Sequence, residues 1–343
     1  MAESNIKQPS SILIIGVTGR LGYELAAASL QASHPTFCLV RPSSLSDKDK
    51  AHKVQVLSDS GAVIIEGSLH DEESLFEAVK QVNVVICAVN SKQVLDQKPL
   101  ISAIKKAGCI ERFIPSEFGL DPDITDISGM DQGFYSRKSE IRRLVEAEGI
   151  PHTYVSCNFF MSYLLPSLVQ PGLKAPPRDK VSIFGDGNVK GVFMKERDVA
   201  AFTIRTVDDP CTLNKVLYLR PPGNVYSMNE LVEIWEHKIG KQLEKIYVSE
   251  EDLLKKIKGN VHPKNTFIQV FCQIRLHNIV LNKIVVLSET PYPDNMEMVF
   301  IYAAFVKGFQ TCFEVEASGG VEGSLLYPNL KCTTISTYLD TLL

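Results

Sequence analysis

A glycine-rich segment near the N-terminus has the residue types that a bound phosphate requires. The sequence GVTGRLG at residues 16–22 follows the apolar run ILII and precedes a helical pattern from Tyr23 to Gln31. Glycine permits a sharp turn and a close approach of the backbone to a pyrophosphate, and the following helix offers free N–H groups and a positive dipole end. A position between a first strand and a first helix predicts dinucleotide binding. The alternative is a glycine-rich turn without a ligand.

The second apolar run is followed by a cation, Arg41. An NAD-binding protein usually places an acidic residue here against the ribose hydroxyls, whereas a guanidinium suits a 2′-phosphate. The sequence therefore favours NADPH over NADH. Lys48, Lys50 and Lys53 follow within a few turns. We take Lys50 as the candidate for a second charge at the cofactor; a solvated helix face is the alternative for each lysine.

A lysine among arginines is the candidate for proton chemistry. Lys138 lies beside Arg137, and Arg142 and Arg143 follow it. Partial burial and a nearby cation lower the pKa of an ammonium group, so that the neutral amine can remove a proton from a bound substrate. The alternatives are a solvated helix residue or a clamp on the ribose hydroxyls. Tyr135 lies three residues from Lys138, not four as in the Tyr-x-x-x-Lys motif, so we expect packing or a substrate contact from it.

Further candidates follow the fifth and sixth apolar runs. Ser116 and Glu117 fall at the carboxyl edge of the expected sheet, where ligands bind in open α/β folds; a turn cap and a structural ion pair are the alternative. Small-molecule pockets have apolar walls with few polar anchors, and four side chains are candidates for such walls, with a place in the core as the alternative. These four are Phe159, Met161, Tyr163 and Val169.

The elements that must hold these residues follow an α/β pattern. Short apolar runs alternate with amphipathic segments from Ser11 to about Ser156. Such runs predict a doubly wound, Rossmann-like parallel sheet covered on both faces. We assign residues 1–157 to an NADP-binding domain and 158–343 to a smaller substrate-binding lobe, with some crossover of the chain. Expected helices include 72–79, 100–107, 138–148, 228–238 and 250–257, with a last one from about Ser336.

The amino-acid composition excludes several classes of protein. With 343 residues, of which 45% are hydrophobic, the chain can bury a substantial core, and its net charge of -4 gives no basic field for a nucleic acid or an anionic membrane. No apolar run has the length and flanks of a signal peptide or a transmembrane helix, so we expect a cytoplasmic protein. Eight cysteines without Cys-x-x-Cys spacing predict reduced thiols, and seven histidines without ligand spacing predict no metal site.

Four later blocks complete a family signature: PSEFG at 115–119, RKSEIRR at 137–143, IPHTY at 150–154 and GDGN at 185–188. Together with the glycine segment and Arg41, they make the chain resemble the plant pinoresinol-lariciresinol, isoflavone and phenylcoumaran benzylic ether reductases of the NmrA-like, atypical short-chain dehydrogenase group. The resemblance extends from Ile12 to Asp340. It implies a Rossmann-like fold and an NADPH-dependent reductase.

The resemblance also implies roles for residues. In that family the lysine of Lys-x-x-Ile-Arg-Arg is the general base beside the nicotinamide, which is Lys138 here. The leading hypothesis is reduction of pinoresinol to lariciresinol, and the alternative is reduction of a phenylcoumaran benzylic ether or an isoflavone. A non-catalytic NmrA-like NADP(H) sensor is a further alternative, and a homodimer is the implied assembly. The residues assigned to the cofactor by resemblance are Gly16, Thr18, Gly19, Arg20, Leu21, Gly22, Arg41, Asn158 and Phe160.

One stretch departs from the family pattern. Relatives pass directly from a segment like LLKKIK at 253–258 to one like ETPYPDN at 289–295, which makes residues 259–288 an insertion. Its richness in Ile, Val, Phe, Asn and Lys is typical of a translated AT-rich intron, and our hypothesis is a retained intron or a gene-model error. Sequencing the mature transcript tests it: codons spliced out support it, and codons kept in the message and in the intact protein refute it.

Overall fold

The computed structural model describes residues 8–127, 129–259, 275–276, 279–280 and 292–343. The predicted insertion at 259–288 lies outside the described residues, apart from the last residue of α9 (Glu250–Gly259) and the short strands β13 (Arg275–Leu276) and β14 (Ile279–Val280).

A five-stranded parallel sheet organises the first half of the chain. Its strands stand in the order β3-β2-β1-β4-β5, and each pairs in parallel with its neighbours. All residues of β1 and β4 are buried, as expected for a sheet covered on both faces. The predicted doubly wound α/β fold is confirmed. The strands are β1 (Ile12–Ile15), β2 (Thr36–Val40), β3 (Val63–Glu66), β4 (Val84–Cys87) and β5 (Arg112–Ile114).

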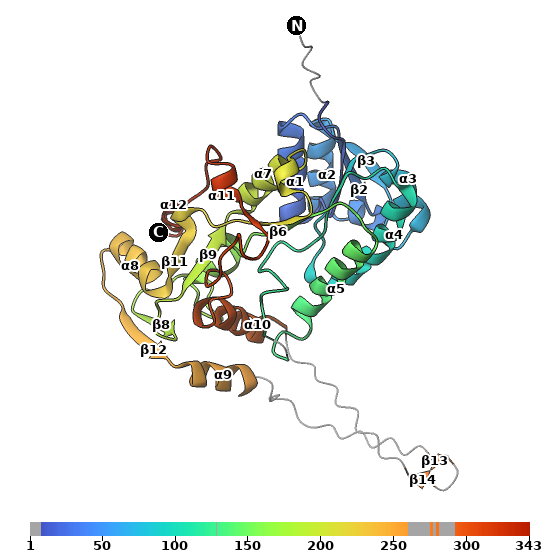
Figure 1. Cartoon of the computed structure of the whole chain (residues 1–343). Coiled ribbons are helices and arrows are strands. Elements are labelled where there is room, and N and C mark those ends of the chain that lie inside the picture. The colour runs from blue at the N-terminus through green and yellow to red at the C-terminus, as the bar shows by residue number, and fades with distance from the viewer. Residues whose placement is uncertain (1–7, 128, 260–274, 277–278, 281–291) are drawn as a thin grey trace.

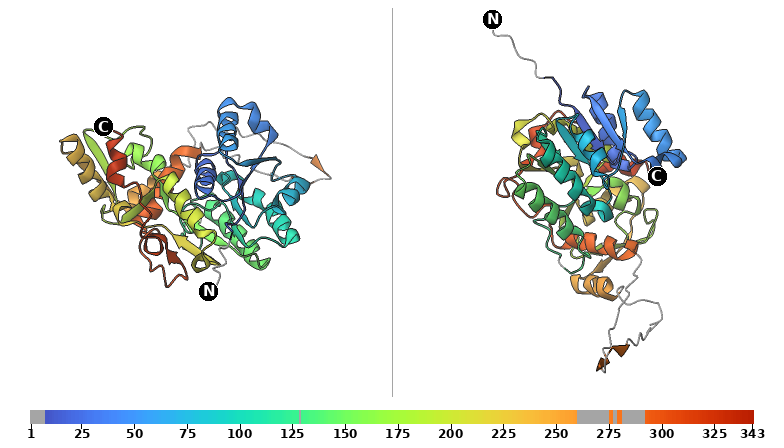
Figure 2. Two further views of the ribbon diagram at one scale, coloured as in Figure 1. Left: turned by 90° about the horizontal axis from the view of Figure 1, so that it is seen from above. Right: turned by 90° about the vertical axis from the view of Figure 1, so that its right-hand side faces the viewer.

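Helices cover both faces of this sheet (Figures 1 and 2). On one face α1 (Arg20–Gln31) and α2 (Lys48–Asp59) share a core with α7 (Glu196–Thr206), a helix from the second half of the chain. On the other face α3 (Glu72–Val79), α4 (Lys98–Ala107) and α5 (Phe134–Ala147) share a second core. The apolar stripes that predicted α3 and α4 from the sequence face the sheet in this way.

Helix α5 begins four residues earlier than the sequence pattern predicted. The Asp131 carboxylate accepts hydrogen bonds from the backbone N–H groups of Gly133 and Tyr135, at 3.1 and 2.8 Å. Gly133 has a φ of +74°, a left-handed conformation that turns the chain into the helix. The helix therefore starts at Phe134, and Lys138 lies in its second turn.

A second, three-stranded sheet adjoins the first sheet at β5, with its strands in the order β15 (Val321–Glu322), β10 (Lys215–Tyr218) and β6 (Thr153–Ser156). Strand β6 follows a bridge between Phe113 and His152 and pairs in parallel with β10. Strand β10 in turn pairs with β15, close to the C-terminus. Both strands come from the half of the chain that was assigned to the other lobe. The chain thus crosses between the two assigned regions, as expected.

The remaining elements form a second lobe, at the lower left in Figure 1. Its core contains Trp235, Phe193 and Phe305, all with almost no exposed surface. Its strands are β7 (Phe159–Phe160), β8 (Lys180–Phe184), β9 (Lys190–Met194), β11 (Val225–Ser227) and β12 (Glu244–Val248). Its helices are α6 (Met161–Leu164), α8 (Met228–Ile239), α9, α10 (Tyr292–Ile301) and α12 (Ile335–Asp340), while α11 (Gly323–Leu326) follows β15.

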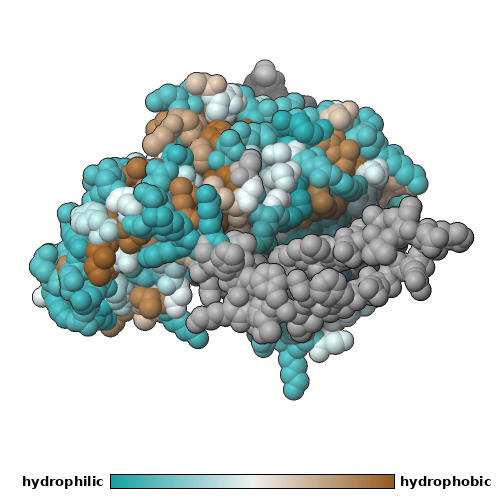
Figure 3. Space-filling view, turned by 90° about the horizontal axis from the view of Figure 1, so that it is seen from below, coloured by the Kyte–Doolittle hydropathy of each residue, from teal (hydrophilic) through white to brown (hydrophobic). Residues whose placement is uncertain are grey.

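The surface of the molecule is mixed in polarity. On the face shown in Figure 3, outside the grey atoms, hydrophilic side chains surround separate apolar patches. None of the helices in the described part of the chain is long and apolar enough to cross a membrane. The cysteines of the described residues are free thiols, and no cluster of three or more His, Cys, Asp or Glu side chains there could hold a metal ion.

Candidate active site

The glycine segment after β1 is closely packed against the neighbouring strand and helix. Gly16 has a φ of +96°, and a Cβ on it would lie 2.3 Å from the carbonyl oxygen of Ala88, at the end of β4. A Cβ on Gly22 would lie 2.1 Å from the carbonyl oxygen of Gly16. Only glycine fits at these two positions, because any larger residue would force the loop away from β4 or α1 away from the loop.

A cleft of about 360 Å³ lies along the carboxyl ends of β1, β2, β3 and β4. Five of the residues predicted to bind the cofactor line it: Gly16, Thr18, Gly19, Arg41 and Lys50. The lining also includes residues that the sequence reasoning did not single out: Ser44, Gly67, Ser68, His70, Asn90 and Gln93. Their common signal is a place just after a strand of the sheet, where ligands of open α/β folds bind.

The shape and charge of this cleft fit a dinucleotide phosphate. Arg41 is exposed at the mouth of the cleft directly after β2 and can receive a 2′-phosphate. The Lys50 ammonium lies 2.9 Å from the Asp47 carboxylate, on the same wall. Lys53 instead donates to the carbonyl of Thr18, at 3.3 Å, and so supports the glycine segment.

The other residues assigned to the cofactor lie outside the lining of this cleft. The Arg20 guanidinium donates to Ser162 Oγ at 2.5 Å and lies 3.6 Å from the Glu196 carboxylate. Asn158 donates from its side chain to the carbonyl of Leu219 and has a φ of +61°. Leu21, Gly22 and Phe160 are also outside the lining. The assignment to the cofactor stays a prediction for these five residues and for the five that line the cleft.

Lys138 is buried, with an exposed fraction of 4%, and so is not a solvated helix residue. Its Nζ donates a hydrogen bond of 2.6 Å to the backbone carbonyl of Glu117 and lies 4.4 Å from the centre of the Phe134 ring. Burial, together with the charge of Arg142, lowers the pKa of Lys138 to about 8, although Glu117 opposes this change. Near neutral pH such an amine can give and take a proton.

Hydrogen bonds connect Lys138 to the cleft through the loop after β5. Ser116 Oγ donates to the carbonyl of Val89, a residue of the cleft wall, at 2.8 Å. Glu117, the next residue, holds Lys138. Strands β4 and β5 are neighbours, so their carboxyl ends meet at the same edge of the sheet. The lysine therefore belongs to the edge of the sheet that carries the cofactor cleft.

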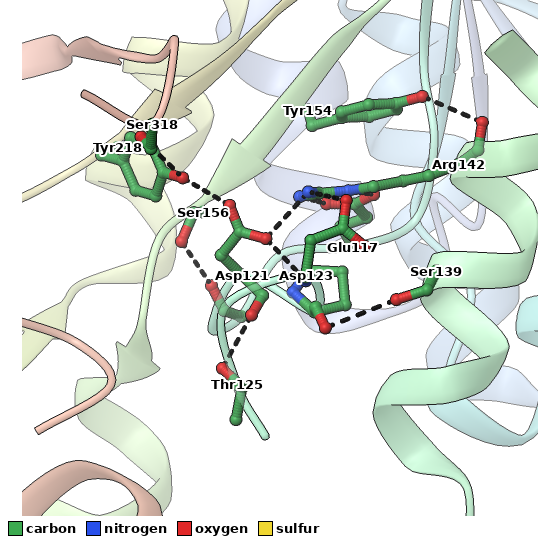
Figure 4. Close-up of polar contacts among 12 residues, drawn as sticks. Glu117, Asp121, Asp123, Thr125, Ser139, Arg142, Tyr154, Ser156, Tyr218 and Ser318 are labelled. Atoms are coloured by element: carbon green, nitrogen blue, oxygen red, sulfur yellow. Dashed lines mark hydrogen bonds and ion pairs between the residues drawn. The ribbon is translucent and has the colours of Figure 1, made fainter. Parts of the chain in front are cut away.

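Glu117 also forms the structural ion pair that was one of its two alternatives. Its carboxylate accepts from Arg142 Nε and Nη2, at 2.7 and 2.6 Å. Arg142 binds Asp121 and Asp123 as well, at 2.8 and 3.1 Å (Figure 4). Burial alone would lower the pKa of Arg142, but these carboxylates raise it above its usual value. From the sequence, Arg142 was considered only as a cation near Lys138. Its burial was not predicted, because an arginine interrupts the apolar repeat by which the core positions of a helix are recognised.

An aromatic cluster lies on the side of Lys138 toward the second lobe. The ring of Phe300, on α10, lies 5.2 Å from that of Phe134 and 6.2 Å from that of Tyr163, between centroids. Tyr135 and Phe159 complete the cluster, at 6.3 and 6.5 Å from Phe300. Tyr163 is 42% exposed, so the cluster reaches the surface. Phe134 and Phe300 were not among the predicted substrate residues.

The predicted substrate residues thus separate into two groups. Phe159 and Tyr163 lie in the aromatic cluster, whereas Met161 and Val169 have no exposed surface and lie within the core of the second lobe. Tyr135 is also almost completely buried, and burial raises its pKa above the usual value. A contact between Met161 or Val169 and a substrate stays a prediction.

A doubly wound sheet with a glycine-lined cleft at one edge, and a buried lysine of lowered pKa at the same edge, defines a dinucleotide-dependent oxidoreductase. The sequence model of the NmrA-like family matches residues 8–339, and the chain belongs to this family. Within it, the chain falls among the pinoresinol-lariciresinol, phenylcoumaran benzylic ether and isoflavone reductases, as the resemblance predicted.

Individual relatives support this placement. The chain is 56% identical to "Probable pinoresinol-lariciresinol reductase 3" of Arabidopsis thaliana, over 98% of this chain and 99% of that protein. It is 49% identical to "Phenylcoumaran benzylic ether reductase IRL1" of Ginkgo biloba, over 96% and 98%. A solved structure described as "AtPrR2 with NADP+ and (+)pinoresinol" matches with a TM-score of 0.83 and 34% identity, over 98% of this chain and 99% of that one.

Proposed function

We propose that this protein is an NADPH-dependent reductase of a phenylpropanoid-derived phenol, with pinoresinol, reduced to lariciresinol, as its substrate. The observation that carries the proposal is the placement of Lys138, buried between the cofactor edge of the sheet and a cluster of aromatic rings. The name of the most identical relative reported above and the pinoresinol in the solved relative favour a lignan.

Proton removal is the step that the chain's own residues perform. The neutral amine of Lys138 takes the proton of the substrate's phenol, and the phenolate then opens the benzylic ether para to it, which leaves a quinone methide and an alkoxide. The hydrogen bond to the Glu117 carbonyl holds the amine in place for this transfer. The alkoxide that leaves the benzylic carbon takes up a proton from water. The phenolate that hydride addition regenerates then takes back the proton held by Lys138, so the amine is neutral again at the end of the reaction.

The benzylic carbon of the opened ring is electron-poor, and NADPH held by the glycine segment and Arg41 would supply a hydride to it. The aromatic cluster around Phe300 offers the apolar surface on which a phenolic ring can pack and from which water is excluded. The Arg41 side chain would hold the 2′-phosphate of the bound cofactor.

A second candidate function is reduction of a phenylcoumaran benzylic ether. The observation in its favour is the 49% identity over almost the whole chain to a relative of that name. The phenylcoumaran ether is also benzylic, so the same deprotonation would open it. Isoflavone reduction and a non-catalytic sensor complete the set of alternatives that an assay must separate.

The decisive experiment measures NADPH consumption by the purified protein with pinoresinol, a phenylcoumaran and an isoflavone in parallel. We expect turnover of pinoresinol, with loss of at least 100-fold in kcat for Lys138→Ala, the scale of a lost general base. The matched control is Lys80→Ala, which removes an exposed lysine paired with Glu77. NADPH binding without turnover of any of the three substrates would refute the reductase and favour the sensor.

The proposal includes a cytoplasmic location and a homodimer. Free thiols throughout the described residues are consistent with a reducing compartment. Cell fractionation tests the location, and light scattering of the purified protein with and without NADPH tests the assembly. A monomer at micromolar concentration would contradict the dimer without affecting the reductase.

A further inference from the structure

Glu117 contacts helix α5 in two different ways, and the proposed proton transfer uses only one of them. Its backbone carbonyl accepts the hydrogen bond from Lys138 Nζ, whereas its carboxylate accepts two from Arg142. Lys138 and Arg142 are four residues apart and so lie on the same face of the helix, one turn from each other. One loop residue therefore holds both buried cations of this helix face.

We propose that Glu117 is a positioning residue for Lys138: its carboxylate, fixed by Arg142, orients the carbonyl that holds the Lys138 amine and balances the cationic charge next to that amine. This inference rests on the function proposed above, in which Lys138 is the base. It assigns a role to a carboxylate that does not itself touch the reacting atoms.

Several buried contacts hold the loop after β5, which contains Glu117, in place. The Asp121 carboxylate accepts from Arg142 at 2.8 Å and from the phenol of Tyr218, on β10, at 2.5 Å. The Arg142 guanidinium lies over the ring of Tyr154, on β6, at 4.5 Å. The loop after β5 is thus tied to α5, β6 and β10 together (Figure 4). A rotation of the Glu117 carbonyl away from Lys138 would strain this buried network.

Gly119 and Phe134 also limit the space around the Lys138 amine. A Cβ on Gly119 would lie 3.3 Å from Lys138 Nζ, closer than most such contacts. The aromatic ring of Phe134 lies 4.4 Å from the same atom. The amine therefore fits between Gly119 and Phe134 only while the Glu117 carbonyl keeps its place.

Few charged groups face the Lys138 amine from the elements packed against it. From the loop after β5 it faces Glu117, and from its own helix Arg142. Cys157, after β6, also faces it, but burial raises the pKa of this thiol to about 12, so it is neutral. The phenol of Tyr135 is neutral for the same reason, because burial raises its pKa. Loss of the Glu117 charge would thus leave Arg142 as the nearest charge and lower the pKa of Lys138.

The test is the pair of pH profiles of kcat and of kcat/KM for wild type, Glu117→Gln and Asp123→Asn, with the best substrate of the three. Since only the neutral amine accepts a proton, the wild-type rate rises with pH through an acid limb near pH 8. We expect Glu117→Gln to move this limb by about one pH unit to lower pH and to lower the plateau of kcat. Asp123→Asn removes a half-exposed carboxylate from the same guanidinium and should leave the limb in place. A Glu117→Gln limb at the wild-type pH would overturn the proposal.

A conservative variant keeps the test informative if Glu117→Gln does not fold. Glu117→Asp retains the charge but shortens the reach to Arg142, so we expect a limb at the wild-type pH and a plateau of kcat reduced by about tenfold. A wild-type plateau in this variant would show that the length of the side chain has no effect on the base, and the positioning role would be wrong.

A second measurement separates failure of this inference from failure of the proposed function. Competitive acylation with acetic anhydride, followed by mass spectrometry of the peptide that contains Lys138, reports the titration of this amine without any turnover. A protein that turns over no substrate would refute the reductase, yet a lower titration pH in Glu117→Gln would still support the positioning role. Coincident titration curves in wild type and variant would refute that role on their own.

Discussion

Arg41 is the side chain on which the choice of cofactor is expected to depend. It lines the cleft directly after β2 and is exposed. A guanidinium that binds the 2′-phosphate contributes about 1.5–3 kcal/mol, so Arg41→Ala should weaken NADPH binding roughly ten- to hundredfold and leave NADH binding nearly unchanged. Calorimetric titration with both cofactors measures this, with the exposed Lys48→Ala as a charge-matched control. Equal losses for NADPH and NADH would contradict the assignment.

We expect the buried Lys138 to lower the free energy of unfolding of the protein. Its folded-state pKa of about 8 lies below the ordinary value of 10.5, so between these pH values the unfolded chain holds a proton that the folded chain has released. The free energy of unfolding of the wild type therefore rises with pH across this window and carries the full penalty below pH 8. Lys138→Met, which does not titrate, should be more stable by about 2 kcal/mol at pH 7, after allowance for the lost hydrogen bond to Glu117.

Urea denaturation of both proteins at several pH values checks this second expectation. The advantage of Lys138→Met in free energy of unfolding should shrink as the pH rises from about 8 to 10.5. If the free energies of unfolding of Lys138→Met and wild type differ by the same amount over the whole pH range, burial does not shift the titration of Lys138.

The elements of this fold differ in how well the sequence predicts them. Helix α3 was predicted with both ends correct, because its apolar residues repeat with a clear helical period and Asp71 caps its start. Helix α5 was predicted to start too late, because its first turn is set by the left-handed Gly133 and by the bond from the Tyr135 N–H to the Asp131 carboxylate, not by an apolar period. The position of the glycine segment between a first strand and a first helix was predicted correctly from local patterns, whereas the role of Arg41 stays a prediction.

The contact between α5 and α10 is of another kind. Phe134 and Phe300 are 5.2 Å apart between ring centroids but far apart in the sequence, and neither carries a local signal of a binding role. Such a pair follows from how the second lobe packs on the sheet domain. A single sequence does not contain that information in any local pattern, so the aromatic cluster could be found only in the structure.

The turn from β1 into α1 gives a prediction about close packing between elements. The Cβ of Gly22→Ala would lie 2.1 Å from a backbone oxygen, whereas that of Gly19→Ala would lie 3.1 Å from the same oxygen and its φ of -77° is ordinary. We expect Gly22→Ala to lower the free energy of unfolding by about 2–4 kcal/mol and Gly19→Ala by less than about 1 kcal/mol, without cofactor present. Thermal unfolding of both variants measures the difference. Similar losses in the two would contradict the proposed contact between α1 and the loop.

At the scale of the whole molecule, the assignment of residues 1–157 and 158–343 stays a proposal about function, and the crossover makes it a poor division for folding. Strand β10 pairs with β6, and α7 covers α1 with Val199 and Phe202, both almost fully buried. In the opposite direction, Leu120, Ile127 and Tyr135 of the first half lie in the core of the second lobe. Each half of the chain therefore completes the core of the other.

This interdependence predicts that residues 1–157 do not fold alone. The fragment would expose the apolar surface that α7, β10 and their neighbours cover. The loss of four large buried side chains from this core would lower the free energy of unfolding by roughly 6–12 kcal/mol. That cost is comparable to the whole stability of a typical domain. We expect the fragment to show no cooperative thermal transition and no binding of NADPH, and the full chain to unfold in one transition that NADPH shifts upward. A fragment that melts sharply and binds NADPH would show that the part of the chain from β1 to β6 is a domain in its own right, and that the crossing elements only connect it to the second lobe.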